Sequence, residues 1–379
     1  MNIGFDAKRY FLNATGLGTY SRNTIRLLDR YAPEHDYFLY TPKISSRFGS
    51  PVSGPNIHTR TPANVITRVF HPLWRTFLLG RQTTQDSLDI FHGLSHEIPY
   101  GISRATKTVV TVHDLIFLRH PKLYHRVDVA LYTAKYRSSC RRADRIIAIS
   151  EQTKQDITTF FSIDPEKIDV VYQSCDPAFY LPLSAHDLQS VRSRYSLPDA
   201  YLLYVGSFAE RKNVLTLIEA LGRMHPTLRI PLVLVGRGNK SYLTRMHAAI
   251  EKNRLTKDII FLHTVPAADL PAIYQQARLF VYPSLYEGFG IPILEALFSR
   301  TPVITSQGSC FREAGGPDTI YTPPGDVDAL ARSMEQVLKN SALAANMREK
   351  GRHYARAFHE RQVAHQLLAV YIDLCAQQC

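Results

Sequence analysis

Two glutamates in the segment YEGFGIPILEAL, residues 286–297, are separated by seven residues and flank a glycine-containing turn. Pro292 favours the first turn of a helix, so Glu287 precedes the predicted helix and Glu295 lies one turn inside it. A carboxylate accepts hydrogen bonds from hydroxyl groups, which suits Glu295 to a ribose and Glu287 to a sugar. The structural alternative is a tight turn whose first-turn glutamate stabilises the helix.

The first backbone amides of this predicted helix carry the positive end of the helix dipole and suit a phosphate or a sugar oxygen. They belong to Phe289, Gly290 and Ile291. A glycine-rich turn by itself is weak evidence for a ligand site.

A second polar segment, VGSFAERKN at residues 205–213, contains the adjacent cations Arg211 and Lys212. The preceding apolar run predicts a strand that ends at Gly206, and Asn213 can cap a helix over residues 214–224. Ligands of open α/β sheets bind beyond the carboxyl ends of the strands, so this loop predicts a diphosphate site. Considered singly, the two cations would be ordinary surface charges.

In the N-terminal half, the segment TGLGTY at residues 15–20 joins a predicted strand to a helix, and Gly16 and Gly18 allow close approach of a ligand to the backbone. His113 and Asp114 follow the apolar run 108–112, which places an imidazole beside a carboxylate at a strand end. A structural histidine is the alternative.

Composition limits the possible functions. The 379 residues are 45% apolar and carry a net charge of +12, which favours an anionic partner. The five cysteines form no CxxC pair, so neither a zinc site nor a disulfide framework is indicated. The Asp326-Val-Asp328 pair is interpreted as a helix start, so no metal and no cofactor are expected. No signal peptide or membrane-spanning run is evident, which predicts a cytoplasmic protein.

Two basic stretches, residues 68–77 and 119–145, lie in the N-terminal half. They fit either a solvated surface or peripheral contact with an anionic membrane at its inner face. No nucleic-acid-binding motif accompanies them, so no nucleic acid partner is expected.

The elements that would position these residues are short apolar runs alternating with helical stretches. Strands are predicted at 108–112, 145–149, 201–205, 231–235, 259–261, 279–282 and 302–305, and helices at 214–224, 267–277, 329–338 and 356–379. Several runs lack polar alternation, which is typical of strands covered on both faces. The pattern predicts a doubly wound α/β fold. A proline-rich interval at 177–200 is the expected interdomain linker.

Taken together, these segments resemble the family-4 retaining glycosyltransferases of the GT-B fold (glycosyl transferases group 1), from the first strand to the last helix. The motifs that carry the resemblance are 15–20, 113–114, 205–213 and 287–295. It implies two Rossmann-like domains that face each other across a cleft. Residues 1–180 would form the acceptor-side domain, with the helix 356–379 crossing back to it, and residues 200–355 would bind the nucleotide sugar.

The resemblance also implies roles for single residues. Arg211 and Lys212 match diphosphate ligands, Glu295 a ribose ligand, and Glu287 the group that holds the donor sugar. His113 matches the residue near the reacting carbon. The remaining matches are to nucleotide-binding backbone positions: Gly16, Gly18, Gly206, Val265, Phe289, Gly290 and Ile291.

The implied activity is transfer of a sugar, with a mannose-like donor favoured, from a nucleoside diphosphate to a polysaccharide or lipid-linked acceptor with retention of configuration. Departures from the family pattern at 298–300 and at Arg312 leave the donor base open. Two alternatives stay open at this point. They are a nucleotide-sugar epimerase of the same fold and a non-catalytic basic binding protein.

Overall fold

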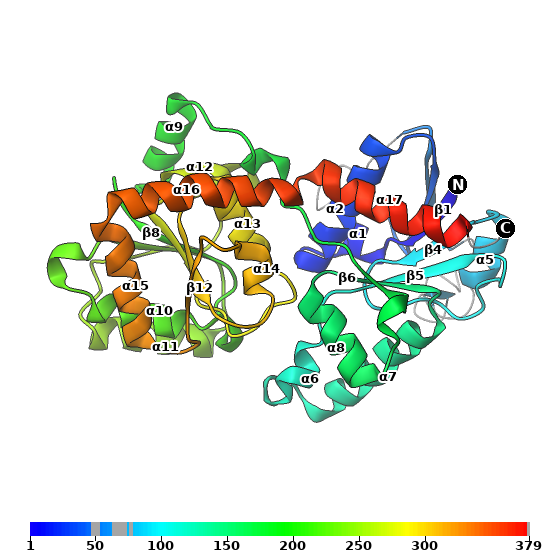
Figure 1. Ribbon diagram of the computed structural model, residues 1–379, viewed down its shortest axis with the longest axis horizontal. Helices are drawn as coiled ribbons and strands as arrows, with labels where there is room; N and C mark the ends of the chain where they lie inside the picture. Colours follow the sequence, from blue (N-terminus) through cyan, green and yellow to red (C-terminus); the bar gives the residue numbers. More distant parts are fainter. Residues whose placement is uncertain (47–53, 63–73, 76–78, 377–379) are drawn as a thin grey trace. The chain divides into compact units, whose positions relative to one another are not determined.

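A computed structural model describes residues 1–46, 54–62, 74–75 and 79–376 (Figure 1). The chain divides into unit 1, Met1–Gln173 with Glu360–Cys379, and unit 2, Ser174–His359. Each unit is built on its own parallel β-sheet with helices on both faces. The predicted doubly wound α/β fold is confirmed, and the strands expected from apolar runs are all present within one or two residues of their predicted limits.

The sheet of unit 1 has seven strands in the order β3-β2-β1-β4-β5-β6-β7. The strands are β1 (Asn2–Asp6), β2 (Asp36–Tyr40), β3 (Ile57–Arg60), β4 (Ile90–Gly93), β5 (Lys107–Val112), β6 (Arg145–Ala148) and β7 (Ile168–Val170). The helices are α1 (Lys8–Leu12), α2 (Gly16–Tyr31), α5 (Leu79–Gln85), α6 (Ile116–Arg119), α7 (Arg126–Arg142), α8 (Glu151–Phe161) and α17 (Glu360–Ala376).

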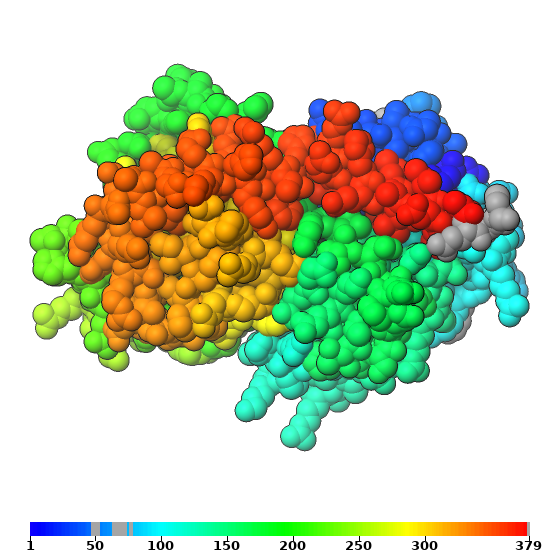
Figure 2. All heavy atoms as spheres, viewed as in Figure 1, coloured from blue at the N-terminus to red at the C-terminus, as the bar shows by residue number. Residues whose placement is uncertain are grey.

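Both faces of this sheet are covered. One core cluster joins strand residues such as Ile3 and Phe5 to α2 and to α17 residues including Leu367 and Tyr371. A second cluster packs the opposite side chains of β4, β5 and β6 against α7 and α8. This double burial explains why the strands read as nearly continuous apolar runs. The solvent-facing side of α17 is visible in red in Figure 2.

The sheet of unit 2 has six strands in the order β10-β9-β8-β11-β12-β13. The strands are β8 (Leu202–Val205), β9 (Leu232–Val235), β10 (Ile259–Leu262), β11 (Leu279–Tyr282), β12 (Val303–Ser306) and β13 (Ile320–Thr322). The helices are α9 (Ala185–Tyr195), α10 (Val214–Arg223), α11 (Lys240–Lys252), α12 (Leu270–Gln276), α13 (Ile291–Phe298), α14 (Phe311–Gly315), α15 (Val327–Lys339) and α16 (Ser341–Ala355).

The interval 177–200 is not a linker. It contains α9, which is tied to the rest of unit 2 by the Arg194–Asp269 ion pair at 2.8 Å and by a 3.0 Å hydrogen bond from Arg192 to Gln276. The proline spacing misled the prediction, because prolines can also begin short helical turns within a domain. The boundaries between the units fall instead after Gln173 and before Glu360.

Candidate active site

The loops that follow β8 and β11 meet at one edge of the unit 2 sheet, because these strands are direct neighbours. The loop after β8 ends in a 3₁₀ turn, Glu210–Lys212, and the loop after β11 runs to the start of α13. The backbone amide of Leu285 donates to the carbonyl of Arg211 at 2.8 Å, which links the two loops directly. The two segments singled out in the sequence are therefore brought together.

Glu287 lies at the centre of this junction. Its Oε1 accepts hydrogen bonds from Lys212 Nζ at 2.5 Å, from Ser284 Oγ at 2.6 Å and from the Tyr282 hydroxyl at 3.1 Å. Its Oε2 lies 2.6 Å from Nη1 of Arg211. Burial acts to raise the pKa of Glu287, but Lys212 and Arg211 outweigh it and lower the pKa to about 2. The carboxylate is therefore ionised at neutral pH.

The cluster of Arg211, Lys212 and Glu287 carries a net charge of +1. The sequence-based interpretation treated Arg211 and Lys212 as two cations directed only at a ligand, whereas both already pair with Glu287. Burial lowers the pKa of Lys212, and Glu287 opposes that effect. Removing one member of such a buried set leaves the others uncompensated, so Glu287 is also a structural support.

Glu295 occupies a different environment on the first turns of α13. Its Oε2 accepts a hydrogen bond of 2.8 Å from the Tyr274 hydroxyl. Burial raises the pKa of Glu295 to about 7, because no cation offsets the loss of solvation. The helix itself begins at Ile291 after Gly290, whose φ of 114° is a conformation that favours glycine.

The other predicted unit 2 positions differ in what their side chains do. Gly206 directly follows β8 with a φ of 156°, and a Cβ there would lie 2.8 Å from the Tyr204 hydroxyl. Phe289 is buried, and its ring packs against Phe358 at 5.6 Å, so only its backbone is suited to a ligand. Val265 follows β10 and is half-buried.

His113 lies in unit 1, directly after β5. Its Nε2 is 2.9 Å from the carbonyl oxygen of Leu94, so Nε2 carries the proton and Nδ1 has a lone pair. The rings of Tyr20 and His96 lie 4.5 Å and 5.0 Å away. Burial lowers the pKa of His113 to about 4, so the imidazole is neutral at pH 7. The neighbouring Asp114 accepts a 3.1 Å hydrogen bond from the amide of Ile116.

The two N-terminal glycines lie in the first turn of α2 and not in a loop. A Cβ at Gly18 would lie 2.0 Å from the carbonyl oxygen of Asn13, so the close approach that Gly18 permits is to this chain's own backbone. A Cβ at Gly16 would meet nothing within 4 Å. Only Gly16 leaves the open space that a ligand needs.

Three residues of the site were not predicted from the sequence. Tyr282 and Ser284 bind the carboxylate of Glu287, and Tyr274 binds that of Glu295. Each lies at or near the end of an apolar run, a position that gives no specific signal. Their roles depend on which side chains the fold places opposite them.

Asp326 caps α15 by accepting a 2.8 Å hydrogen bond from the amide of Ala329, as predicted. Within the described residues, no three His, Cys, Asp or Glu side chains are grouped closely enough to hold a metal ion. No helix in the described part of the chain is long and apolar enough to cross a membrane.

Several cations of the basic stretch 119–145 make internal contacts. Arg119 pairs with Asp156 at 2.7 Å, and Arg142 donates to the carbonyls of Ile98 and Pro99 at 2.8 Å each. These charges support the fold of unit 1. The stretch 68–77 lies outside the described residues except for positions 74 and 75.

Two family models match the chain over most of its length. Residues 189–354 match the model "Glycosyl transferases group 1", and residues 14–179 match "Glycosyltransferase Family 4". The O-antigen chain mannosyltransferase B of Escherichia coli is 31% identical over 80% of this chain and 78% of that protein. The chain belongs to the group 1 glycosyltransferases.

Other similarities extend this result. The group 1 glycosyltransferase described here is 30% identical to the serotype-specific mannosyltransferase WbdA of Escherichia coli over 68% of this chain, but that match spans only 32% of WbdA. The crystal structure of Anabaena HepE in complex with UDP and glucose covers 98% of this chain and 100% of HepE, with a TM-score of 0.75 and 18% identity. The similarity to HepE shows a shared fold, and with the two parallel sheets it identifies the GT-B fold.

Proposed function

We propose that this glycosyltransferase moves a mannose-like sugar from a nucleoside diphosphate sugar to a glycan or lipid-linked acceptor, with retention of configuration. The observation that carries the proposal is the cluster at the carboxyl ends of β8 and β11, in which the buried Glu287 pairs with the half-buried Arg211 and Lys212. The names of the two mannosyltransferase relatives support the donor sugar and a glycan acceptor, and the UDP and glucose bound to HepE support a nucleotide-sugar site.

The roles follow from charge. Breaking the bond between the sugar and the diphosphate leaves negative charge on the phosphate oxygens, which fixed cations and amides stabilise. Arg211 and Lys212 fill that role, together with the backbone N–H groups at the start of α13. Glu287 holds both cations in place and accepts hydrogen bonds from the transferred sugar.

The remaining roles are proposed for residues of each unit considered by itself. Glu295 accepts hydrogen bonds from the ribose, and the backbones at Gly206 and Val265 approach the nucleotide. His113 contacts the transferred sugar through its neutral imidazole, and Gly16 approaches a phosphate. Retention would result from front-face attack, in which the departing phosphate takes the proton of the acceptor hydroxyl.

No divalent metal is needed in this proposal. The cluster supplies a net charge of +1, less than the two full charges expected from the sequence, and the helix dipole of α13 adds about half a charge. Catalysis then depends on hydrogen bonds to the phosphates as well as on net charge. Contact with an anionic membrane surface stays a prediction.

The test is a product assay with guanosine, uridine and adenosine diphosphate sugars, with mannobiose as acceptor and excess EDTA present. We expect acceptor-dependent transfer, reduced at least 100-fold in Glu287→Gln and unchanged in the exposed-site control Glu251→Gln. Because Glu287→Gln also leaves the half-buried Arg211 and Lys212 without their carboxylate, its melting temperature is measured alongside. Lys212→Arg, which keeps the charge, provides a second variant of the cluster.

Two outcomes contradict the proposal. Isomerisation of the donor without any acceptor would identify an epimerase. Activity that EDTA abolishes and magnesium or manganese restores would show that a metal, and not the cluster, stabilises the leaving group.

A further inference from the structure

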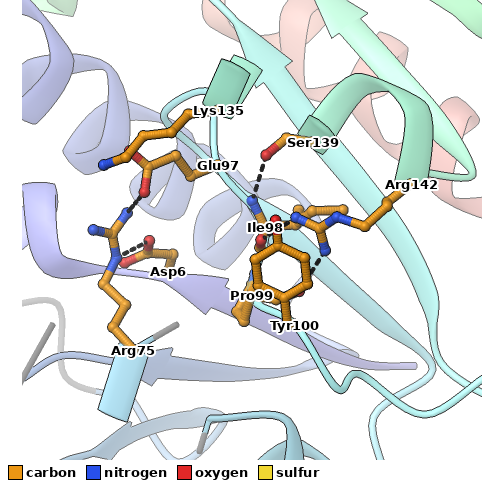
Figure 3. Close-up of a pocket in the computed structure, with 9 residues that line it drawn as sticks. All are labelled: Asp6, Arg75, Glu97, Ile98, Pro99, Tyr100, Lys135, Ser139 and Arg142. Carbon is orange, nitrogen blue, oxygen red and sulfur yellow. Dashed lines mark hydrogen bonds and ion pairs between the residues drawn. The ribbon is translucent and has the colours of Figure 1, made fainter. Parts of the chain in front are cut away.

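Unit 1 contains a cavity of about 220 Å³ beside the carboxyl end of β1 (Figure 3). Its walls come from the end of β1, from the loop after β4, from α7 and from Arg75. The lining residues are Asp6, Arg75, Glu97, Ile98, Pro99, Tyr100, Lys135, Ser139 and Arg142. None of them belongs to the site that the sequence predicted.

One side of the cavity is lined by a row of four charged side chains of alternating sign. Arg75 Nε lies 2.6 Å from Asp6 Oδ2, and Arg75 Nη2 lies 3.2 Å from Glu97 Oε2. Lys135 Nζ lies 3.6 Å from Glu97 Oε1. The exposed fraction of the side chains rises along this row, from 5% at Asp6 and 20% at Arg75 to 34% at Glu97 and 48% at Lys135. The row of charges therefore extends from the buried floor of the cavity to its accessible rim.

The facing side combines the apolar Ile98, Pro99 and the ring of Tyr100 with Ser139 and Arg142. Arg142 stacks over the ring of Tyr100, with its guanidinium carbon 4.0 Å from the ring centroid, and donates to the carbonyls of Ile98 and Pro99. Ser139 Oγ accepts a hydrogen bond from the amide of Ile98 at 3.3 Å. Figure 3 shows these groups gathered on the side of the cavity away from Arg75. Arg142 thus holds the wall in place.

The balance of charge indicates the class of ligand. Two carboxylates and two cations cancel along this row, and the third cation of the lining, Arg142, leaves a net charge of +1. Because Arg142 already donates to the carbonyls of Ile98 and Pro99, its hydrogen bonds are used within the wall. Carboxylates accept hydrogen bonds from hydroxyl groups, and guanidinium and ammonium groups donate to hydroxyl oxygens. With the ring of Tyr100 and two apolar residues on the wall opposite, this arrangement suits a neutral ring that bears hydroxyl groups. Pockets for drug-sized ligands have volumes of about 300–1,000 Å³, so this smaller cavity suits a single sugar ring.

The location adds a second argument. Asp6 ends β1 and His113 follows β5, and these strands flank β4 in the same parallel sheet. Both residues therefore lie at the carboxyl edge of the sheet, where ligands of open α/β folds bind. A sugar in the cavity would lie on the same edge as His113.

We infer that this cavity binds the terminal sugar residue of the acceptor glycan, with Glu97 and Lys135 as its hydrogen-bonding rim and Asp6 and Arg75 as its floor. The inference rests on the proposed function and specifies its acceptor subsite. It predicts that the acceptor is recognised by its neutral sugar hydroxyls and not by a phosphate.

The experiment compares Glu97→Gln with Glu166→Gln, an exposed carboxylate elsewhere in unit 1 that serves as the matched control. We expect Glu97→Gln to raise the KM for mannobiose at least tenfold while the KM for the nucleotide sugar changes less than twofold. The control variant should match the wild type in both. Equal rises in both KM values, or no rise for mannobiose, would overturn the inference.

A binding measurement separates this inference from the proposed function. Saturation-transfer NMR of mannobiose with the wild-type protein, without any donor, should show contact that Glu97→Gln and Tyr100→Ala each weaken. If the wild type transfers no sugar, the proposed function fails while this measurement still decides the cavity. Inorganic phosphate that competes with mannobiose, or mannobiose binding unaffected by both variants, would show that the cavity is not a neutral sugar site.

Discussion

At the scale of single residues, Glu287 and Glu295 show how one short segment produces two carboxyl groups with opposite properties. Glu287 is buried and Glu295 is half-buried, and the loss of solvation acts to raise both pKa values. Two cations reverse the effect at Glu287 and lower its pKa to about 2, whereas a single tyrosine hydroxyl leaves that of Glu295 at about 7. The partners, and not the burial, decide the charge.

A pH dependence of donor binding follows from Glu295. An ionised carboxylate accepts hydrogen bonds from both ribose hydroxyls, so we expect affinity for the nucleotide sugar to rise as the pH increases through about 7. The change is at most about tenfold per pH unit below the pKa. Calorimetric titration at pH 6, 7 and 8 measures it. The nucleotide sugar is used because a terminal phosphate would itself titrate near pH 6.

The variant Glu295→Gln is the control for this prediction. It should bind the donor more weakly than the wild type at pH 8 and show no rise between pH 6 and 8. The same pH slope in wild type and variant would assign the titration to another group.

The sequence predicted which loops form this site but not the state of its residues. Gly206, Pro292 and the apolar runs place Glu287, Arg211 and Lys212 at strand ends, since these features act locally. The ion pairs inside the cluster depend on β8 and β11 being neighbours, a long-range pairing that spacing does not encode. The cavity of unit 1 was missed for the same reason, because Asp6, Glu97 and Lys135 come from three separate elements.

At the scale of elements, α2 shows that two glycines in one motif can have different causes. A Cβ at Gly18 would overlap the Asn13 carbonyl, whereas Gly16 has open space. Both glycines were predicted to approach a ligand. The sequence does not distinguish a glycine required by contact with the protein's own backbone from one required by contact with a phosphate. Helix α1 was likewise missed because it has only five residues, and α9 was missed because Val191 is its one buried residue and gives no clear apolar period.

We expect Gly18→Ala to lower the free energy of unfolding of unit 1 by about 1–3 kcal/mol, because the added methyl group must displace backbone. Gly16→Ala is the matched control in the same helical turn and should change it by less than about 1 kcal/mol. Urea unfolding followed by circular dichroism compares the two. Equal effects at both positions would mean that the first turn of α2 adjusts more easily than its geometry indicates.

At the scale of the whole molecule, the last helix is joined to the first unit by a buried polar contact. His92 Nδ1 lies 2.6 Å from the hydroxyl of Tyr371 on α17, and His92 Nε2 lies 2.8 Å from Thr111 Oγ1. Burial lowers the pKa of His92 to about 3, and it also lowers those of His96 and His113. All three imidazoles are neutral in the folded unit at neutral pH.

Unit 1 should therefore lose stability in mild acid. The folded pKa values lie below the unfolded value of about 6.5, so the unfolded chain binds more protons, and stability falls as the pH drops from about 6.5 toward 4. Replacing one of these buried histidines should therefore remove part of the dependence of stability on pH. We expect the urea midpoint to fall less between pH 7.5 and pH 5 in His92→Gln than in the wild type. The variant His125→Gln, at an exposed site of unit 1, should keep the full dependence on pH.

The lower overall stability expected of His92→Gln does not affect this comparison, which concerns the change with pH. Because the two units can unfold separately, each transition is analysed by itself. An identical pH slope in the wild type and His92→Gln would show that His92 does not contribute to the acid sensitivity.

The return of α17 to unit 1 also sets an order of events during translation. Helix α17 supplies part of one core of unit 1 but leaves the ribosome only after all of unit 2. Domains generally fold as they emerge, so unit 2 can complete its fold while one apolar face of the seven-stranded sheet, which precedes unit 2 in the sequence, is covered by α2 but not yet by α17. Unit 1 thus begins to form before unit 2 but is finished after it, and in that interval its partly uncovered face is a natural binding site for a chaperone.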